Sequence, residues 1–405
     1  MRVVVTGFGA LTPIGSTKEE LISAMRNCKC AIDEITHYPI EDRVVTLAAE
    51  LKDYAADKEF SRKEINRLDR VNQFAMIAAK NAMKDSKLSK EEIENKRVGV
   101  YITSGIGGLR TIEEDHLRGM NRSFDKLSPY FIPKAIINSV GANVAIDLGA
   151  HGSCLSIVTA CASSTNAIGE AYRAIKGGYE EIIFAGGSEA SITELGIGGF
   201  TSMKALSTSK DKNRASIPFD KDRNGFVMGE GAGVLVLESL ESALERGANI
   251  IAELVGYGVN CDAYHITSPS PDGKFATKAI SDAIKDAGIS ADEIDYINAH
   301  GTSTFLNDKI ETLAIKNVFG DRKIKVSSSK SQIGHLLGGS GVVESILSIL
   351  AMNENFLPPL INFKNKDPEC ELNFALEAEE YDINYFLKNS LGFGGHNAAL
   401  IFKRY

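Results

Sequence analysis

The feature that most constrains the fold of this chain is an internal repeat. Residues 82–93 read AMKDSKLSKEEI and residues 283–294 read AIKDAGISADEI, identical at six of twelve positions and 201 residues apart in a chain of 405. Each copy ends a stretch with small and apolar residues at helical spacing, carries an S-x-x-E pattern typical of a helix cap, and runs into an apolar, strand-like segment. The repeat predicts that both halves of the chain contain the same helix, cap and strand.

A second unit of similar order follows in each half. It consists of a short apolar strand, expected at 156–158 and at 324–326, then a turn of small residues and a helix. Cys161 lies in the first of these turns and His335 in the second. Strands that alternate with helices favour a layered α/β fold. A duplicated α/β fold would bring Cys161 and His335 together near a shared pseudo-twofold axis.

The repeat also sets the expected domain organisation. The chain is long enough for two to three average domains, and we expect two similar halves, 1–250 and 251–405. The repeat and the reactive turn are separated by 68 residues in the first half and 41 in the second. The first half therefore carries about 27 additional residues, which we expect within 104–150.

Composition excludes several classes of protein. Hydrophobic residues make up 43% and charged residues 24% of the chain, the balance of an ordinary globular protein. The net charge of −8 gives no overall support for nucleic-acid binding. Six scattered cysteines suggest no disulfide framework, so a reducing, cytoplasmic setting is expected. The N-terminal residues read as a strand and turn rather than a signal peptide, and no apolar run reaches the ~18 residues of a membrane span.

Two familiar motifs are incomplete. Residues 6–9 read TGFG after the first strand, but Thr12 stands where a dinucleotide-binding loop needs glycine. Asp220, Asp222 and Asn224 match the start of a calcium loop, whose twelfth position is here Gly231 instead of glutamate. Neither a nucleotide site nor a metal site is expected.

One cysteine and two histidines remain as candidates for chemistry. Cys161 stands between two alanines at the start of a predicted helix, where free N–H groups and the helix dipole are expected to lower the pKa of a thiol. His300 and His335 each lie in a glycine-containing turn after a predicted strand, which is where α/β folds place ligand sites. A thiolate and two imidazoles suit thioester chemistry. The alternatives are an inert buried cysteine and two structural histidines.

A glycine-rich segment near the C-terminus adds to this set. Residues 389–397 read NSLGFGGHN, and glycines let the backbone approach a ligand closely. The N–H groups of this segment could complete an oxyanion hole. Taken alone, the segment would equally be a plain turn between two strands.

These segments together resemble the β-ketoacyl-[acyl-carrier-protein] synthases, in particular the type II elongating enzymes of bacterial fatty-acid synthesis. The resemblance covers the whole chain, through VVVTGFGALTPIG, SGIGGL, TACASS, PFDKDRNGFVMGEGAG, NAHGTST, KSQIGHLLG and NSLGFGGHNAALIF. It implies a thiolase-like fold, a duplicated five-layered α/β/α/β/α architecture, and a homodimer. It also implies an enzyme without metal or organic cofactor.

The resemblance assigns a role to each matching position. Cys161 is the implied acyl-accepting nucleophile, while His300 and His335 are implied to bind the malonyl thioester carbonyl and promote decarboxylation. Relatives that start chains have asparagine at the third position, and thiolases have a second cysteine. The remaining implied residues are Lys330, which supports the second histidine; Glu344, an acid of the same network grouped with the substrate site; Phe393, a gating residue whose N–H joins that of Cys161 in the oxyanion hole; Thr302 and Thr304, for the pantetheine arm; Ile106 and Phe200, for the acyl pocket; and Lys63, Arg67 and Lys204, for carrier docking.

The chain departs from the family pattern at three places. Phe305 replaces a usual proline next to the pantetheine threonines, where it would narrow the entrance, and His396 replaces a usual threonine beside the gating loop. Residues 151–153 read HGS where family members have Arg-Gly-Pro. These departures bear on acyl-chain preference.

The implied reaction is a decarboxylative Claisen condensation. Cys161 would accept an acyl group from acyl carrier protein and then condense it with malonyl-acyl-carrier protein. Two alternatives remain open from the sequence: a polyketide-type ketosynthase acting on other chains, and a non-catalytic partner subunit, against which the intact cysteine and histidines argue.

Overall fold

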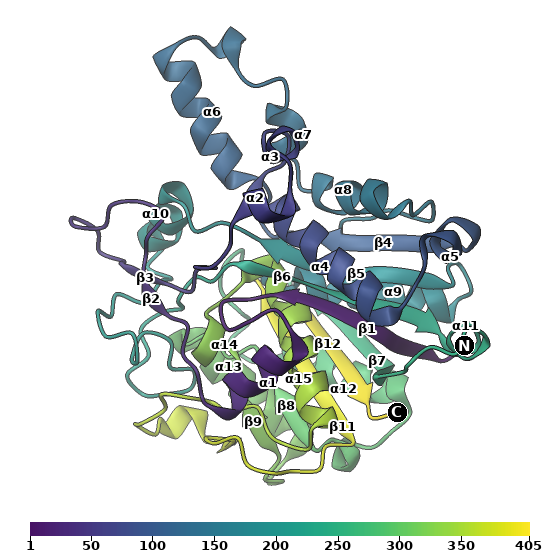
Figure 1. Cartoon of the computed structure of the whole chain (residues 1–405). Helices are drawn as coiled ribbons and strands as arrows, with labels where there is room; N and C mark the ends of the chain where they lie inside the picture. The colour runs from purple at the N-terminus through teal and green to yellow at the C-terminus, as the bar shows by residue number, and fades with distance from the viewer.

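The computed structural model describes residues 1–405 and is built around one continuous ten-stranded sheet (Figure 1). Its order is β10-β9-β8-β11-β12-β7-β1-β6-β5-β4. The strands are β1 (Val3–Leu11), β4 (Val98–Thr103), β5 (Ile182–Glu189), β6 (Gly231–Ser239), β7 (Ala252–Cys261), β8 (Tyr296–Asn298), β9 (Lys325–Ser327), β10 (Asn373–Phe374), β11 (Tyr385–Gly392) and β12 (His396–Lys403). A separate two-stranded sheet pairs β2 (Asp33–Glu34) with β3 (Leu47–Ala48).

The sheet repeats one pairing pattern in each half. In the first half β4 pairs parallel with β5, and β5, β6 and β1 follow antiparallel. In the second half β8 pairs parallel with β11, and β11, β12 and β7 follow antiparallel. The antiparallel pair β1 and β7 joins the two halves into one sheet. The duplication expected from the sequence is therefore present in the strand topology.

Helices cover the sheet in three layers. The helices are α1 (Lys18–Arg26), α2 (Ala56–Glu59), α3 (Arg62–Ile65), α4 (Arg70–Ser86), α5 (Lys90–Asn95), α6 (Leu109–Asn121), α7 (Phe131–Ala135), α8 (Ser139–Leu148), α9 (Ser163–Lys176), α10 (Glu194–Ser202), α11 (Leu240–Glu245), α12 (Lys274–Ala287), α13 (Phe305–Phe319), α14 (Lys330–Ile333) and α15 (Ser340–Asn353). Helices α4 and α8 pack on the outer face of the first half, and α12 and α13 on that of the second. Helices α9 and α15 pack together in the middle, between the two halves of the sheet. The three helix layers and the two halves of the sheet give the five layers of the predicted thiolase-like fold.

The largest hydrophobic core lies in that middle layer. Side chains of both α9 and α15 join it, including Ile168 and Ile175 from the first half and Val342 and Ile346 from the second. The two halves thus share one core, and both central helices begin in the same interior region. Cys161 lies just before α9, and His335 lies between α14 and α15.

Both copies of the repeat adopt the predicted local structure. Ser89 and Ser290 each form a capping box, with Glu92 and Glu293 respectively. The cap opens a helix, α5, in the first half but only a 3₁₀ turn, Ala291–Glu293, in the second. The strand expected at 156–158 is wrong: the chain pairs with β4 only at Cys154, in an isolated bridge to Val100, and is irregular afterwards.

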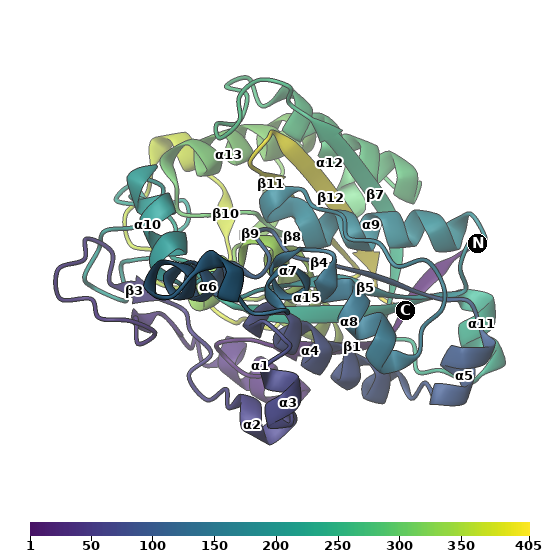
Figure 2. The same ribbon diagram turned by 90° about the horizontal axis from the view of Figure 1, so that it is seen from above.

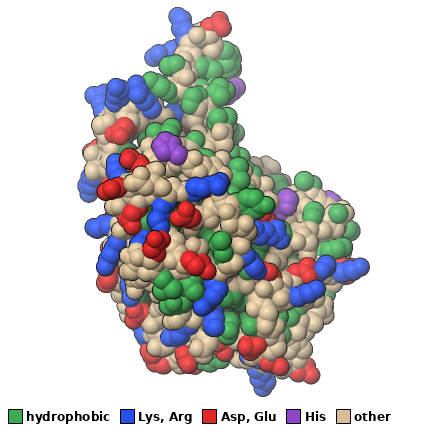
Figure 3. Space-filling model, turned by 90° about the vertical axis from the view of Figure 1, so that its right-hand side faces the viewer, with side chains coloured by type: hydrophobic (Ala, Val, Ile, Leu, Met, Phe, Trp, Pro, Cys, Tyr) green, Lys and Arg blue, Asp and Glu red, His purple; other side chains and the backbone are tan.

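The additional residues of the first half form a projection. Helices α6 and α7 fall within the predicted 104–150 and rise from the body of the molecule (Figure 1). Figure 3 shows hydrophobic side chains along this projection and charges of both signs over the rest of that face. The large hydrophobic side chains exposed on the projection are Ile112, Leu117, Met120, Phe124, Ile132 and Ile136. No helix of the chain combines the length and apolarity needed to cross a bilayer.

Candidate active site

Cys161 lies in a tight turn at the start of α9. Residues Ala160–Ala162 form a 3₁₀ turn, and Ala160 has a left-handed backbone (φ 51°). Ser163 braces the turn, since its hydroxyl accepts the Thr159 N–H (2.9 Å) and donates to the Ala160 carbonyl (2.6 Å). A left-handed alanine is an uncommon conformation that needs support from its surroundings. The turn presents the Cys161 sulfur to a cavity rather than to the core.

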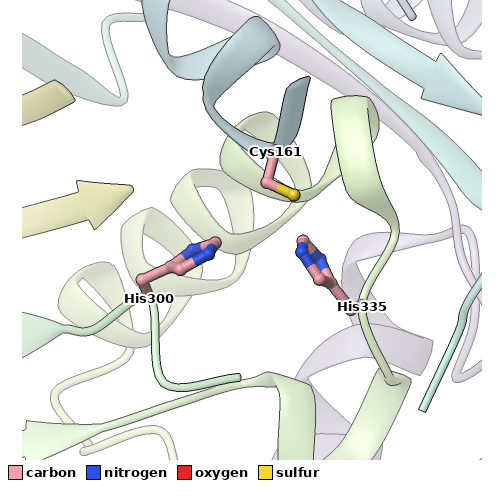
Figure 4. A group of neighbouring side chains, drawn as sticks. All are labelled: Cys161, His300 and His335. Carbon is pink, nitrogen blue, oxygen red and sulfur yellow. The ribbon is translucent and has the colours of Figure 1, made fainter. Parts of the chain in front are cut away.

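The two histidines come from the second half and converge on that sulfur (Figure 4). His300 follows β8, and His335 follows α14. Both are buried, and their ring centres are 5.3 Å apart. One ligand-capable atom from each of Cys161, His300 and His335 lies within 4.8 Å of the others. The three residues predicted to act together therefore meet at one point.

The hydrogen bonds of His335 fix its tautomer. Its Nδ1 accepts the backbone N–H of Leu337 (3.2 Å) and lies 2.8 Å from the Ser340 hydroxyl. A ring nitrogen that accepts a hydrogen bond from an amide carries no proton, so the proton of the neutral ring is on Nε2. That Nε2 is buried and has no protein partner. His335 thus offers an unused N–H donor inside the site.

His300 is held mainly through its backbone. Its N–H donates to the buried carboxylate of Glu311 (2.7 Å), which also accepts the Gly301 N–H (2.7 Å) and the Asn389 amide (2.7 Å). Its Nδ1 is buried without a partner. Burial, then the positive charges of Lys330 and Lys388, hold the pKa of both histidines well below the ordinary value. Both rings are neutral at physiological pH.

The expectation that the helix start lowers the pKa of Cys161 is wrong. Burial raises the pKa of this thiol to about 12, against the opposing effects of Lys330 and of the backbone N–H groups of Phe393 and Cys161. Loss of solvation in the interior outweighs the nearby donors. The resting group is a thiol, and its proton must leave when it attacks.

The two backbone N–H groups are nevertheless well placed for another role. The N–H groups of Phe393 and Cys161 both reach the sulfur, so they also face the carbonyl oxygen of an acyl group attached there. Gly392 makes this approach possible, because a Cβ at this position would lie 2.5 Å from the Thr159 carbonyl oxygen. A pair of backbone N–H donors at one point is what an oxyanion hole requires.

A cavity of about 370 Å³ leads to these residues. Of the predicted substrate residues, Thr302, Thr304 and Phe200 line it, and the two threonine hydroxyls lie 2.9 Å apart. Phe305 also lines it and is half-exposed, with the Arg223 guanidinium 5.1 Å from its ring centre. Ile106 does not line the cavity. It packs instead in the apolar cluster that also contains Phe200 and Cys161.

Lys330 and Glu344 lie behind the histidines. Both are fully buried, and the Lys330 ammonium donates to Glu344 (2.6 Å). Neither lines the cavity. Grouping Glu344 with the substrate-binding residues is therefore corrected, since its carboxylate is enclosed by lysines and cannot reach a ligand. Lys388 completes this buried group and was not predicted from the sequence, where a lysine directly after the apolar residues 385–387 gives no sign of burial.

The predicted docking residues separate into two groups. Lys204 lines the cavity. Lys63, in α3, and Arg67, just after it, do not line the cavity, and the Arg67 guanidinium lies 5.2 Å from the Tyr130 ring centre. His396 begins β12 opposite Gly392 and is likewise outside the cavity lining.

A duplicated α/β fold with a cysteine and two histidines in a shared interior cavity defines a thiolase-like condensing enzyme. The family models of the β-ketoacyl synthase N-terminal and C-terminal domains match residues 1–243 and 251–364. The chain belongs to the β-ketoacyl synthase family.

Individual relatives cover the whole chain. It is 47% identical to the 3-oxoacyl-[acyl-carrier-protein] synthase 2 of Synechocystis, over all of this chain and 98% of that one. It is also 47% identical to the protein of the same name from Staphylococcus aureus, over all of this chain and 99% of that one. A β-ketoacyl synthase from Burkholderia phymatum has the same fold, with a TM-score of 0.93 and 34% identity over all of this chain and 99% of that one. A type II polyketide ketosynthase solved with its acyl-carrier protein gives 0.92 and 33% over the same shares.

Proposed function

We propose that this chain is a 3-oxoacyl-[acyl-carrier-protein] synthase that joins an acyl group on Cys161 to a malonyl unit, with release of CO₂. The observation that carries the proposal is the meeting of one thiol, two neutral imidazoles and two backbone N–H donors at the end of one cavity. Full-length similarity to 3-oxoacyl-[acyl-carrier-protein] synthases supports it.

The first half-reaction is acyl transfer. The Cys161 sulfur attacks the thioester carbonyl of the acyl carrier, and the N–H groups of Cys161 and Phe393 stabilise the developing oxyanion. His335 already carries its proton on Nε2, so His300 is the imidazole that accepts the thiol proton. His300 then returns that proton to the departing pantetheine sulfur. The products are the Cys161 thioester and the free carrier thiol.

The second half-reaction forms the carbon–carbon bond. The malonyl thioester carbonyl accepts hydrogen bonds from His300 and His335, and its carboxylate leaves as CO₂ with the electron pair moving into an enolate. Neutral imidazole donors suit this step, because they stabilise the enolate oxygen without protonating the carbanion. The enolate carbon attacks the Cys161 thioester, the 3-oxoacyl product leaves on the carrier, and the Cys161 thiolate regains a proton from solvent.

In this proposal, different sides of the cavity bind the pantetheine arm and the acyl chain of the substrate. Thr302 and Thr304 bind the pantetheine arm, while Phe200, backed by the apolar cluster that contains Ile106, forms the apolar side that takes the acyl chain. Lys204, at the cavity, attracts the acidic carrier. Lys63 and Arg67 are proposed as additional carrier contacts outside it.

A homodimer is a further part of the proposal. The exposed apolar side chains of the α6–α7 projection, together with the exposed Ile146 and Leu155, are residues that a second copy would cover. Analytical ultracentrifugation should give a mass of two chains, and a monomer at micromolar concentration would refute this part. The cytoplasmic location expected from the sequence remains a prediction that cell fractionation can check.

The test uses Cys161→Ala and His335→Ala with purified acyl and malonyl carriers. Cys161→Ala should abolish acyl transfer and condensation while some malonyl decarboxylation persists, and His335→Ala should suppress CO₂ release. Cys28→Ala, which changes an exposed cysteine, is the matched control and should behave as the unaltered protein. Normal condensation by Cys161→Ala would refute the assignment.

The second candidate is a polyketide-type ketosynthase. Solved polyketide ketosynthases share the fold at 33% identity, including the ishigamide ketosynthase/chain length factor with a TM-score of 0.94. Turnover of a saturated acyl-carrier series separates the two. Activity over successive saturated chain lengths supports fatty-acid elongation, and its absence supports the polyketide alternative.

A further inference from the structure

A second lysine is buried behind the catalytic histidines. Lys388 lies in β11, its side chain is wholly enclosed, and its ammonium is 2.7 Å from Oε2 of Glu344. It also donates to the Asn389 carbonyl oxygen (2.5 Å). Burying an ammonium is unfavourable unless charged and polar partners surround it. A lysine buried in this position is therefore a candidate for a functional role in the site.

Lys388 completes a buried triad with Lys330 and Glu344. The Lys330 ammonium contacts Oε1 of Glu344 at 2.6 Å, and Lys388 contacts Oε2, so each carboxylate oxygen faces one lysine. The side chains of all three residues are at most 1% exposed. Removing Lys388 would leave one oxygen of a buried carboxylate without its cation.

Lys388 is also connected to His300 along the backbone. It precedes Asn389, whose amide donates to Glu311 (2.7 Å), and Glu311 accepts the His300 backbone N–H (2.7 Å). Two ammonium groups and two carboxylates therefore enclose the rear of the site. The other titratable groups that interact with Lys388 are the two histidines themselves, and Tyr296 on β8 interacts with Glu344.

The charge of Lys388 acts on both imidazoles. It is among the positive charges that lower the pKa of His300 and His335, after burial and Lys330. Burial in turn lowers the pKa of Lys388 to about 8, although Glu344 and Glu311 favour its charged form. Lys388 therefore keeps most of its charge at pH 7 and loses it over the pH units just above.

We propose that Lys388 is a positioning residue of the condensation reaction, whose ammonium fixes Glu344 and the Asn389–Glu311 support of His300 and keeps both catalytic imidazoles neutral. The proposal rests on the proposed function, in which neutral imidazoles stabilise the enolate. It predicts that the decarboxylation half-reaction depends on Lys388 more strongly than acylation of Cys161 does, because only decarboxylation needs both rings as neutral donors.

The experiment compares Lys388→Met with Lys325→Met in the full-length protein. Lys325, on β9 of the same sheet, forms an ion pair with Glu379 at the surface and is the matched control. CO₂ release from malonyl carrier protein is measured from pH 5 to 9 alongside acylation of Cys161. Lys388→Met should lower kcat for CO₂ release about tenfold, with KM unchanged, and move the acid limb of its pH profile to higher pH. Lys325→Met should match the unaltered protein.

Each outcome has a distinct meaning. An unchanged kcat and acid limb in Lys388→Met would overturn the role of Lys388, whereas no CO₂ release from the unaltered protein would overturn the proposed function instead. Should Lys388→Met not fold, NMR titration of the ring carbons of His300 and His335 replaces the activity assay. It compares Lys388→Gln with the unaltered protein, and Lys388→Arg, which keeps the charge, is the control. Higher histidine pKa values in Lys388→Gln support the proposal, and identical titrations refute it.

Discussion

The turns that precede the two central helices have similar backbone conformations but differ in their middle residue and in the space around it. Ala160–Ala162 precedes α9 and Leu337–Gly339 precedes α15; each is a 3₁₀ turn whose first residue is left-handed, with φ of 51° and 43°. The middle residue is Cys161 in the first turn and Gly338 in the second. The first turn opens to the cavity, whereas the second is closed by the backbone of Ser104 and Gly105. Duplication thus supplied two equivalent positions, and only one has room for a nucleophile.

The surroundings of the two turns differ in charge as well. Cys161 has apolar neighbours such as Ile106 and Phe200, and its polar contacts come from the backbone. The second half contributes His300, His335, Lys330, Glu344, Glu311 and Lys388, all fully or almost fully buried. In the proposed function, the first half therefore supplies the attacking atom and the apolar side of the cavity, and the second supplies the two imidazoles and the buried lysines and carboxylates behind them.

The largest expected effect on stability is that of Gly338→Ala, which places a side chain in the closed second turn. A Cβ at this position would lie 2.1 Å from the Gly105 nitrogen and 2.7 Å from the Ser104 carbonyl carbon. Backbone atoms cannot yield as a flexible side chain can, so the free energy of unfolding should fall by about 3 kcal/mol or more. Cys161→Ala, at the matching position, keeps its Cβ and should change it by less than about 1 kcal/mol. Urea unfolding measures both, and equal stabilities would contradict the comparison.

The next largest effect is expected from Glu230→Gln, which removes a buried carboxylate just before β6 and should lower the free energy of unfolding. Burial raises the pKa of Glu230, but hydrogen bonds and charges from His37 and Arg70 outweigh burial and lower it to about 2. A lowered pKa stabilises the fold above the unfolded value near 4.5, and this stabilisation is lost as pH falls from there towards 2. Glu230→Gln should lose up to about 3 kcal/mol at pH 7 and show a weaker acid dependence of thermal unfolding.

The control for Glu230 lies in the second half. Glu369 pairs with Lys309 at the surface, and Glu369→Gln should shift the free energy of unfolding by no more than about 0.5 kcal/mol. If Glu230→Gln and Glu369→Gln unfold alike between pH 2 and 7, the buried ion pair contributes nothing.

Smaller, kinetic effects are expected from Phe200→Ala and Phe305→Ala, which change the apolar side and the mouth of the cavity respectively. Phe200→Ala should change the preference among acyl chain lengths, by up to about tenfold between short and long chains, because it enlarges the apolar side. Phe305→Ala should instead change KM similarly for every chain, by less than about tenfold, because it opens the half-exposed mouth. Steady-state kinetics with a chain-length series tests both. A chain-length shift in Phe305→Ala alone would reverse the assignment.

The smallest effect concerns the repeat itself. Ser89 caps a six-residue helix, whereas Ser290 caps a three-residue 3₁₀ turn. Ser89→Ala should cost about 1 kcal/mol of unfolding free energy, and Ser290→Ala less, because fewer backbone N–H groups depend on it. Thermal unfolding of the two variants gives the comparison. A larger loss in Ser290→Ala would show that the second cap supports more structure than its own turn.

Some sequence predictions succeeded because they rested on local chemistry. The capping boxes form, and the strand expected at 324–326 lies within one residue of β9. The strand expected at 156–158 failed, because an apolar run there serves the approach to the Cys161 turn and not a sheet. The predicted fall in the pKa of Cys161 failed for a similar reason: the helix start is local, but burial is set by the whole fold.

The sequence alone determined that the chain is duplicated, which residues are chemically able to act, and that Cys161 and His335 should meet. Only the tertiary structure decided the protonation of the site and the residues behind it. Lys388, Glu311 and Glu344 are distant in the sequence and acquire their meaning from a shared, water-poor interior, where charges act strongly on one another and no local pattern records them.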